Sequence, residues 1–202
     1  WYLHQTQEGR NYFSHQENLT KKLQGYADKS PQNKVDELIR HRLEEMYRPV
    51  TKEAYDKVLP LPEMDEAEAT LKSGRALLII SPDGKTPPGI VGNFFKGLVN
   101  KNNILVLTGD KSSIARIEKA ARHVYAVTKA DNEILASHPQ RKELDEKKAQ
   151  YEQDFQTTVL SVFEKLLFPG NNRGEDVLRP KALDSTYPSK EPYNGERQVV
   201  KT

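Results

Sequence analysis

The chain of 202 residues contains no cysteine, and this absence removes two kinds of site. It excludes disulfide bonds and thiolate-bound metal ions, and it fits a reducing cytoplasm. Charge of one sign is also scarce, because 31 lysines and arginines nearly balance 29 aspartates and glutamates, for a net charge of +2. A nucleic-acid partner would therefore have to be attracted by a local basic patch rather than by the chain as a whole.

Long apolar runs are missing as well, and this bears on membranes and export. No stretch approaches the roughly 20 apolar residues that cross a bilayer, so we expect no membrane partner. The first ten residues, WYLHQTQEGR, lack the apolar centre of a signal peptide, and there is no starting methionine. We therefore expect a cytoplasmic chain that is part of a longer protein.

Two short apolar runs, ALLIIS at 76–81 and NILVLTG at 103–109, indicate the centre of the fold. Their length and lack of alternation are typical of strands buried on both faces of a sheet. Apolar residues at helical spacing between the runs predict a crossover helix, and a second helix should follow Asp110. Because a strand–helix–strand unit joins parallel strands, we predict an α/β fold, or α+β, with a small, mostly parallel sheet flanked by helices.

The N-terminal part, residues 1–49, is predicted to hold a β-hairpin followed by helices. One helix should start at about Asn18, and a second should begin at Ser30-Pro31, which offer a cap and a first-turn proline, and end before Pro49. Residues 50–75, which contain several prolines, are expected to form a connector with short helical pieces.

The C-terminal part is predicted to be one long helix and a tail. The helix should run from Pro139 to about Phe168, where Pro169-Gly170 follows, and it completes a small α/β domain over 76–169. Residues 170–202 are polar and rich in turn-forming residues. We expect this tail to be ordered only against a partner.

The triplet Gly84-Lys85-Thr86 follows the first buried strand and matches the end of a phosphate-binding P-loop. A P-loop needs another glycine five positions earlier, where this chain has Ile79, and backbone N–H groups after the triplet, where it has Pro87 and Pro88. Proline has no backbone N–H and disfavours helical geometry in the residue before it. We interpret the triplet as a turn that cannot enclose a triphosphate.

An alternative reading retains a degenerate phosphate site. Asp110 follows the second strand in the position of a magnesium-binding carboxylate, and it could join Lys85 and Thr86 at the carboxyl edge of the sheet. An aspartate in this position is more often the cap of the next helix, and the sequence GDKSS favours capping. The five histidines show no ligand spacing, so no metal site and no catalytic residue is predicted.

Basic residues near the N-terminus allow a nucleic-acid interpretation. Arg10 lies in the predicted hairpin, Lys21 and Lys22 in the first helix, and Arg40 and Arg42 in the second. Such side chains can neutralise phosphates, although the same residues are also typical of a solvated helix face.

Three segments together resemble one known family. They are EGRNYFSHQENLTKKL at 8–23, NNILVLTGDKSSIARIEKAARHVYAV at 102–127, and ILASHPQRKELDEKKAQYEQDFQTTVLSVFEKLLFPG at 134–170. In this order they are similar to large AAA+ superfamily ATPases that carry a long domain of unknown function, found beside DNA methyltransferases in BREX-like bacterial phage-defence islands. Tyr12-Phe13 stands where the family more usually has Tyr-Trp, and Leu166-Leu167-Phe168-Pro169 matches its Leu-Leu-x-Pro.

The resemblance implies a part of an ATPase that lies after the motor. In that family the P-loop and Walker B motif precede the matched region, so ATP and magnesium would belong to the parent protein and this chain would need no cofactor. The opening hairpin could be the wing of a winged-helix element. The first hypothesis is thus a non-catalytic C-terminal module that couples ATP-driven motion to a partner, either DNA or a protein of the methyltransferase system. The alternatives are an enzyme that uses Lys85, Thr86 and Asp110, and a DNA-binding module.

Overall fold

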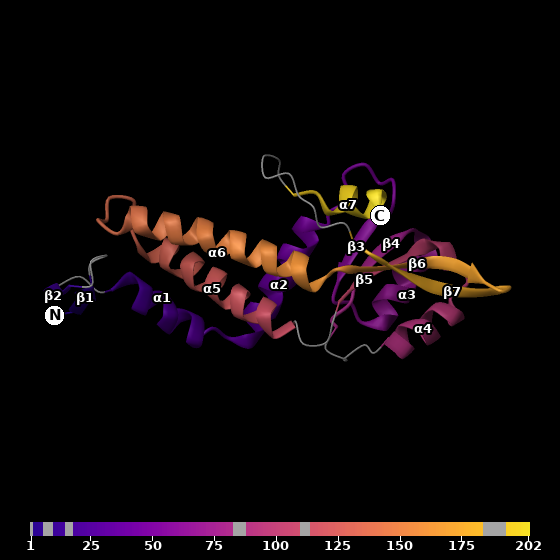
Figure 1. The fold of residues 1–202 in the computed structure, drawn as a ribbon, viewed down its shortest axis with the longest axis horizontal. Coiled ribbons are helices and arrows are strands. Elements are labelled where there is room, and N and C mark those ends of the chain that lie inside the picture. Colours follow the sequence, from indigo (N-terminus) through magenta and orange to yellow (C-terminus); the bar gives the residue numbers. More distant parts are fainter. Residues whose placement is uncertain (1, 6–9, 15–17, 83–87, 110–113, 184–192) are drawn as a thin grey trace. The chain divides into compact units, whose positions relative to one another are not determined.

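The computed structural model describes residues 2–5, 10–14, 18–82, 88–109, 114–183 and 193–202 (Figure 1). The chain divides into two compact units. The helical unit comprises residues 1–38 and 118–157, and the sheet unit comprises residues 39–117 and 158–202. These units cut across the four segments expected from the sequence, because each is assembled from two stretches that are distant along the chain.

The helical unit opens with the predicted hairpin and helix. Strands β1 (Tyr2–Gln5) and β2 (Asn11–Ser14) pair antiparallel. Helix α1 (Leu19–Asp28) begins after Asn18, whose side chain accepts a hydrogen bond from the Lys21 backbone N–H at 3.2 Å. Asparagine is a favoured capping residue because it satisfies a donor that has no partner within the helix. The predicted start of the helix is therefore confirmed.

Three helices share the core of the helical unit: α1, α5 (Ile114–Glu133) and α6 (Arg141–Val162). Their buried residues recur at helical spacing and form one cluster: Leu19, Leu23, Ala27, Ala126, Val127, Ala130, Ile134 and Leu144. Helix α2 (Gln32–Met46) follows α1, and its residues up to Leu38 belong to the helical unit; its apolar residues Val35, Ile39 and Leu43 are buried. The hydroxyl of Ser30 donates to the Ala27 carbonyl, at 2.7 Å, and so satisfies an acceptor at the end of α1.

The sheet unit contains five strands in the order β3-β4-β5-β6-β7. They are β3 (Lys57–Pro60), β4 (Ala76–Ile79), β5 (Ile104–Thr108), β6 (Lys165–Asn172) and β7 (Glu175–Ala182). Strands β3, β4 and β5 are mutually parallel, which confirms the predicted parallel pair, whereas β6 and β7 form an antiparallel hairpin added beside β5. The fold is α/β, and its sheet is mixed rather than mostly parallel.

Two helices pack on one face of this sheet. Helix α3 (Met64–Ser73) connects β3 to β4, and α4 (Pro88–Gly97) connects β4 to β5, as the predicted crossover helix. Both contribute to a core cluster with alternate residues of the strands: Ala67, Leu71, Ala76, Leu78, Ile80, Val91, Phe95, Ile104 and Val106. Leu77 and Ile79, which point to the opposite face of β4, are fully buried too. The unbroken apolar sequence of β4 reflects burial on both faces.

The predicted connector was wrong in one element, since residues 57–60 form strand β3 rather than a helical piece. Pro60 and Pro62 argued against a strand in the sequence. However, β3 lies at the margin of the sheet and pairs only with β4, and Pro60 is its last residue. Proline is tolerated at such a position because few ladder hydrogen bonds depend on its missing N–H.

The predicted long helix and disordered tail were also wrong in part. Helix α6 ends at Val162, not near Phe168, and Leu166 and Leu167 pair with β5 opposite Leu107 and Val106. The β6–β7 turn uses Arg173 and Gly174, both with positive φ, as tight hairpin turns require. In the tail, β7 and helix α7 (Gly195–Lys201) are formed within the sheet unit, so order there needs no separate partner.

Candidate functional site

The carboxyl ends of the parallel strands are where open α/β sheets bind ligands. Strands β4 and β5 end side by side, because Ile79 is paired with Leu107 and the Ile80 N–H donates to the Leu107 carbonyl at 2.9 Å. The predicted phosphate residues Lys85, Thr86 and Asp110 follow these ends, but they lie outside the described residues. Their convergence remains a prediction.

A second candidate is a groove in the helical unit between α1 and α5. This basic groove has a volume of about 620 Å³ and is lined by Lys21, Lys22, Gly25, Tyr26, Lys29, Tyr125 and Lys129. Lys21, Gly25 and Lys29 are four positions apart on α1, and Lys22 and Tyr26 follow the first two of them, so these residues share one face of the helix. Gly25 leaves the groove open, because a Cβ atom added there would have no neighbour within 4 Å.

Tyr26 lies at the centre of the charges around the basic groove. The ammonium groups of Lys129 and Lys22 lie 4.5 and 5.6 Å from its ring centroid, which is cation–π distance. Its hydroxyl donates to the Glu133 carboxylate, and Lys22 Nζ lies 3.3 Å from the same carboxylate. Burial and the bond to Glu133 raise the pKa of Tyr26, and the bond from Tyr26 lowers the pKa of Glu133. Partial burial opposes charge on Lys22, but Glu133 and Tyr26 together outweigh it and raise the pKa of this lysine.

The other three lysines of the groove are not neutralised in this way. Among the described residues, no carboxylate oxygen lies within 4.0 Å of the ammonium group of Lys21, Lys29 or Lys129. Elsewhere in the same unit, lysines of α6 are paired: Lys148 Nζ lies 2.5 Å from Asp131, and Lys142 Nζ lies 4.0 Å from Glu146. The basic groove therefore concentrates positive charge on a chain whose net charge is only +2.

The structure separates the basic residues singled out in the sequence. Lys21 and Lys22 line the basic groove, and Arg10 is exposed in the helical unit. Arg40 and Arg42 belong to the sheet unit, where Arg42 Nη1 lies 3.0 Å from Glu45. Sequence reasoning missed Lys29, Tyr125 and Lys129. The spacing of Lys21, Gly25 and Lys29 indicated one face of α1, but no sequence pattern joined that face to α5.

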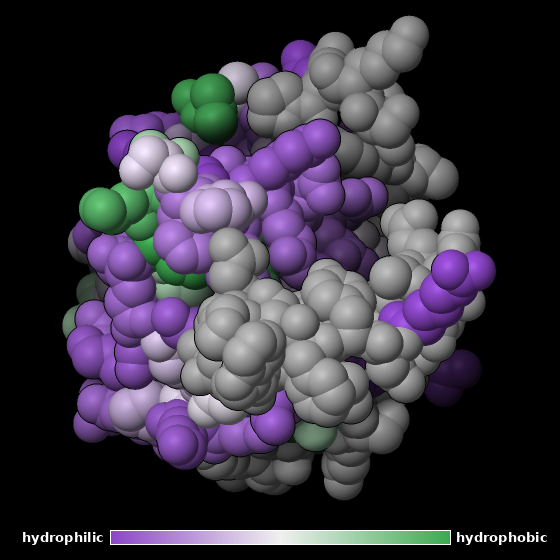
Figure 2. All heavy atoms as spheres, turned by 90° about the vertical axis from the view of Figure 1, so that its left-hand side faces the viewer, coloured by the Kyte–Doolittle hydropathy of each residue, from purple (hydrophilic) through white to green (hydrophobic). Residues whose placement is uncertain are grey.

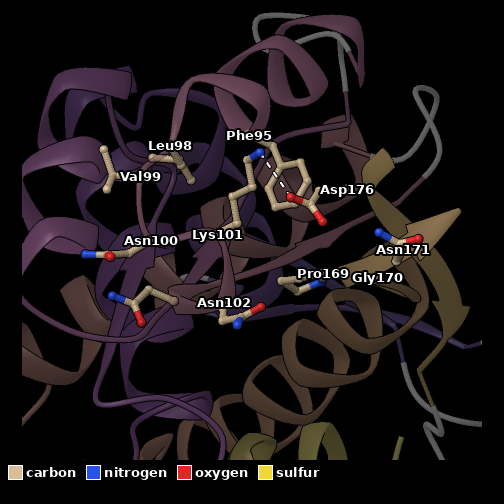
Figure 3. A pocket seen from close by; sticks show the side chains of 11 residues that line it. Phe95, Leu98, Val99, Asn100, Lys101, Asn102, Pro169, Gly170, Asn171 and Asp176 are labelled. Carbon is tan, nitrogen blue, oxygen red and sulfur yellow. Dashed lines mark hydrogen bonds and ion pairs between the residues drawn. The ribbon is translucent and has the colours of Figure 1, made fainter. Parts of the chain in front are cut away.

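A third candidate is a polar pocket of about 700 Å³ in the sheet unit, formed where residues 98–103 meet the β6–β7 hairpin (Figure 3). It includes the short 3-10 helix η1 (Lys101–Asn103) and the exposed amides of Asn100, Asn102 and Asn171. Its two charged groups neutralise each other, since Lys101 Nζ lies 3.2 Å from Asp176. The pocket lies at the amino end of β5, at the opposite edge of the sheet from the usual ligand position.

The charge pattern decides between these candidates. The residues coloured by hydropathy on the face shown in Figure 2 are mostly hydrophilic, so among them exposed apolar area does not single out a binding surface. Within the described ranges, no group of three or more histidine, aspartate or glutamate side chains could hold a metal ion. The same ranges contain no helix that is both long and apolar enough to cross a membrane. Of the two candidates that consist of described residues, the basic groove shows unpaired charge of one sign and the polar pocket does not.

Comparisons of the chain with protein-family models, with curated proteins and with solved structures find no match.

Proposed function

We propose that this chain is a non-catalytic module of a AAA+ ATPase of the kind it resembles, and that its helical unit binds the phosphate backbone of DNA in the basic groove. The observation that carries the proposal is the set of lysines without carboxylate partners, Lys21, Lys29 and Lys129, arranged around Tyr26 and Tyr125. ATP and magnesium would be held by the ATPase core of the parent chain, and the module would pass its motion to the bound DNA.

The chemistry of the groove suits phosphates better than bases. Lysine ammonium groups act as point charges that attract phosphate oxygens without reading the sequence. The tyrosines add hydroxyl groups and ring edges beside these charges. The binding is thus expected to be independent of DNA sequence and strongly dependent on salt, because each neutralised phosphate releases a counterion.

The absence of a phosphate cradle in the sequence supports a non-catalytic role. Pro87 and Pro88 stand where backbone N–H groups would have to hold a triphosphate, and Ile79 stands where a glycine is needed. The register of β4 and β5 favours a second candidate, an enzyme that uses Lys85, Thr86 and Asp110, because the segments that carry them leave adjacent strands.

The decisive experiment measures the salt dependence of binding to a short duplex DNA. The triple variant Lys21→Gln, Lys29→Gln, Lys129→Gln should bind at least about tenfold more weakly at 0.1 M salt, and its slope of log K against log salt should fall by about 2.7. A matched control, Lys72→Gln, Lys96→Gln, Lys142→Gln, removes the same charge from exposed sites outside the groove. Equal losses in the two triple variants, or no loss in either, would contradict the proposal.

A further inference from the structure

The C-terminal residues 193–202 lie against residues 46–55 within the sheet unit, and a buried carboxylate, that of Glu196, bonds to the backbone there. Glu196 is only 1% exposed. Its Oε2 accepts hydrogen bonds from the backbone N–H groups of Val50, at 2.5 Å, and Thr51, at 2.7 Å, and its Oε1 accepts one from Glu53, at 3.0 Å. Three converging backbone donors leave this buried charge well satisfied.

The backbone of residues 50–53 has the geometry of an anion-binding nest. Lys52, between the donors, has φ of 57°, in the left-handed region that residues other than glycine rarely adopt. Successive N–H groups that point to one side in such a turn form a concavity for an anion. The turn therefore provides a site for a carboxylate, and Glu196 occupies it.

The three residues before Glu196 each meet a specific feature. The Tyr193 ring packs edge-on against Tyr47, with centroids 5.9 Å apart and an interplanar angle of 81°. The Asn194 side chain accepts from the Arg197 N–H at 3.0 Å and caps α7. A Cβ atom on Gly195 would lie 2.3 Å from the Tyr47 ring and 2.7 Å from the Met46 carbonyl oxygen. Residues 46–55 thus contact Tyr193, Gly195 and Glu196, while Asn194 caps the helix in which Glu196 lies.

Helix α7 is too short to be stable without contacts to the rest of the sheet unit. It has seven residues, and isolated helices of this length are not stable in water. Its inward face is supplied by Gly195, Glu196, Gln198 and Val199, which are buried. The segment is therefore helical because it is bound, as a short peptide is when it docks on a preformed surface.

We propose that residues 46–55 form a binding site for a peptide that presents a glutamate in the sequence Tyr-Asn-Gly-Glu, that residues 193–202 are its intramolecular ligand, and that the same segment from another molecule can replace it. This inference is independent of DNA binding by the helical unit. It gives the sheet unit a peptide-docking surface, residues 46–55, from which residues 193–202 of the same chain exclude other peptides.

Binding of a labelled synthetic peptide with the sequence of residues 193–202 tests the proposal on the full chain. In the variant Glu196→Lys, the tail carries the wrong charge for the nest, so the site should be free and the peptide should bind. The unmodified chain should bind at least tenfold more weakly, because its tethered tail competes at an effective concentration of about 1 mM. A control peptide with glutamine at the position of Glu196 should bind Glu196→Lys at least tenfold more weakly than the native peptide.

Two outcomes of this titration overturn the proposal. One is that a folded Glu196→Lys chain does not bind the native peptide, and the other is that it binds both peptides equally. Amide hydrogen exchange of the unmodified chain provides a test that needs no variant. The amides of Val50, Thr51 and Glu53 should exchange through an opening that leaves β4 and β5 protected. If they exchange only together with those strands, or if Glu196→Lys does not fold, the tail is an integral part of the core and the site does not exist.

Discussion

At the scale of single residues, Glu196 shows how a buried charge is made compatible with folding. Burial opposes ionisation, but the backbone N–H groups of Thr51, Val50 and Glu53 outweigh it, so the pKa of Glu196 is lowered. The carboxylate is stable inside the sheet unit only as long as these donors face it. The Tyr55 hydroxyl, which is also buried, donates to the Tyr47 carbonyl at 2.7 Å.

We predict that Glu196→Gln lowers the free energy of unfolding by about 2–4 kcal/mol near pH 7. In glutamine an NH₂ group replaces one of the two carboxylate oxygens, so a backbone N–H group that now has an acceptor would face a second donor. Urea denaturation measures this loss.

The same pair of proteins gives a prediction for pH. A group with a lowered folded-state pKa stabilises the fold above its ordinary pKa, here 4.5, and this stabilisation is lost as the pH falls through the folded-state pKa. The difference between the two proteins should therefore shrink below pH 4.5, and a constant difference would contradict the account.

Gly109 allows a close approach of backbone at the end of β5. A Cβ atom there would lie 1.6 Å from the Val162 carbonyl oxygen, at the end of α6, and a main-chain atom cannot move aside as a side chain can. We predict that Gly109→Ala destabilises the sheet unit by about 3 kcal/mol.

The matched control is Gly92→Ala in α4, where a Cβ meets nothing within 4 Å. There the higher helix propensity of alanine should increase the stability by up to about 1 kcal/mol. Thermal unfolding of the two variants in parallel tests the pair, and similar melting temperatures would refute the assignment.

At the scale of elements, the basic groove depends on the spacing of α1 against α5. Gly25→Phe should fill the groove without altering its charge and so weaken DNA binding severalfold, while Gly25→Ala, which adds one methyl group, should bind as the unmodified chain does. Fluorescence anisotropy with a labelled duplex measures both variants, and circular dichroism confirms that α1 is retained. DNA affinity unchanged by phenylalanine would place the DNA elsewhere.

The elements that could be predicted from the sequence are those whose pattern is local. Helix α1 follows a capping asparagine and has apolar residues at helical spacing, and β4 is an apolar run bounded by polar residues. Strands β3 and β6 could not be predicted in this way. Pro60 is compatible with a strand only at a sheet margin. Leu166 and Leu167 match the pattern of a helix end in the sequence, and only their pairing with the distant strand β5 makes them part of a strand.

The same distinction applies to the sites. Lys21 and Lys22 could be identified as a basic pair, but Lys129 joins them through helix packing across about a hundred residues of sequence. The nest that holds Glu196 involves backbone N–H groups, which every residue but proline has, so no residue type indicates it. Only the left-handed conformation of Lys52 and the pairing of two distant segments create it.

At the scale of the whole molecule, the proposed function requires that this chain does not itself react with nucleotide. We predict that isothermal titration calorimetry detects no binding of ATP with magnesium to the isolated chain, because two consecutive prolines, Pro87 and Pro88, occupy the place of the amides that a P-loop requires. ATP hydrolysis by this chain that Lys85→Ala abolishes would refute the non-catalytic assignment and favour the alternative site.

The five-stranded sheet has two open margins, and their composition affects how copies of the chain can associate. Strand β3 is short and ends in Pro60, and β7 contains Pro180 among the charged residues Glu175, Asp176, Arg179 and Lys181. A strand from a neighbouring copy would meet a proline without an N–H group at each margin, and charged side chains along β7. Cross-β growth into fibrils is therefore disfavoured at both margins, and the sheet can stay finite at high concentration without a covering subunit.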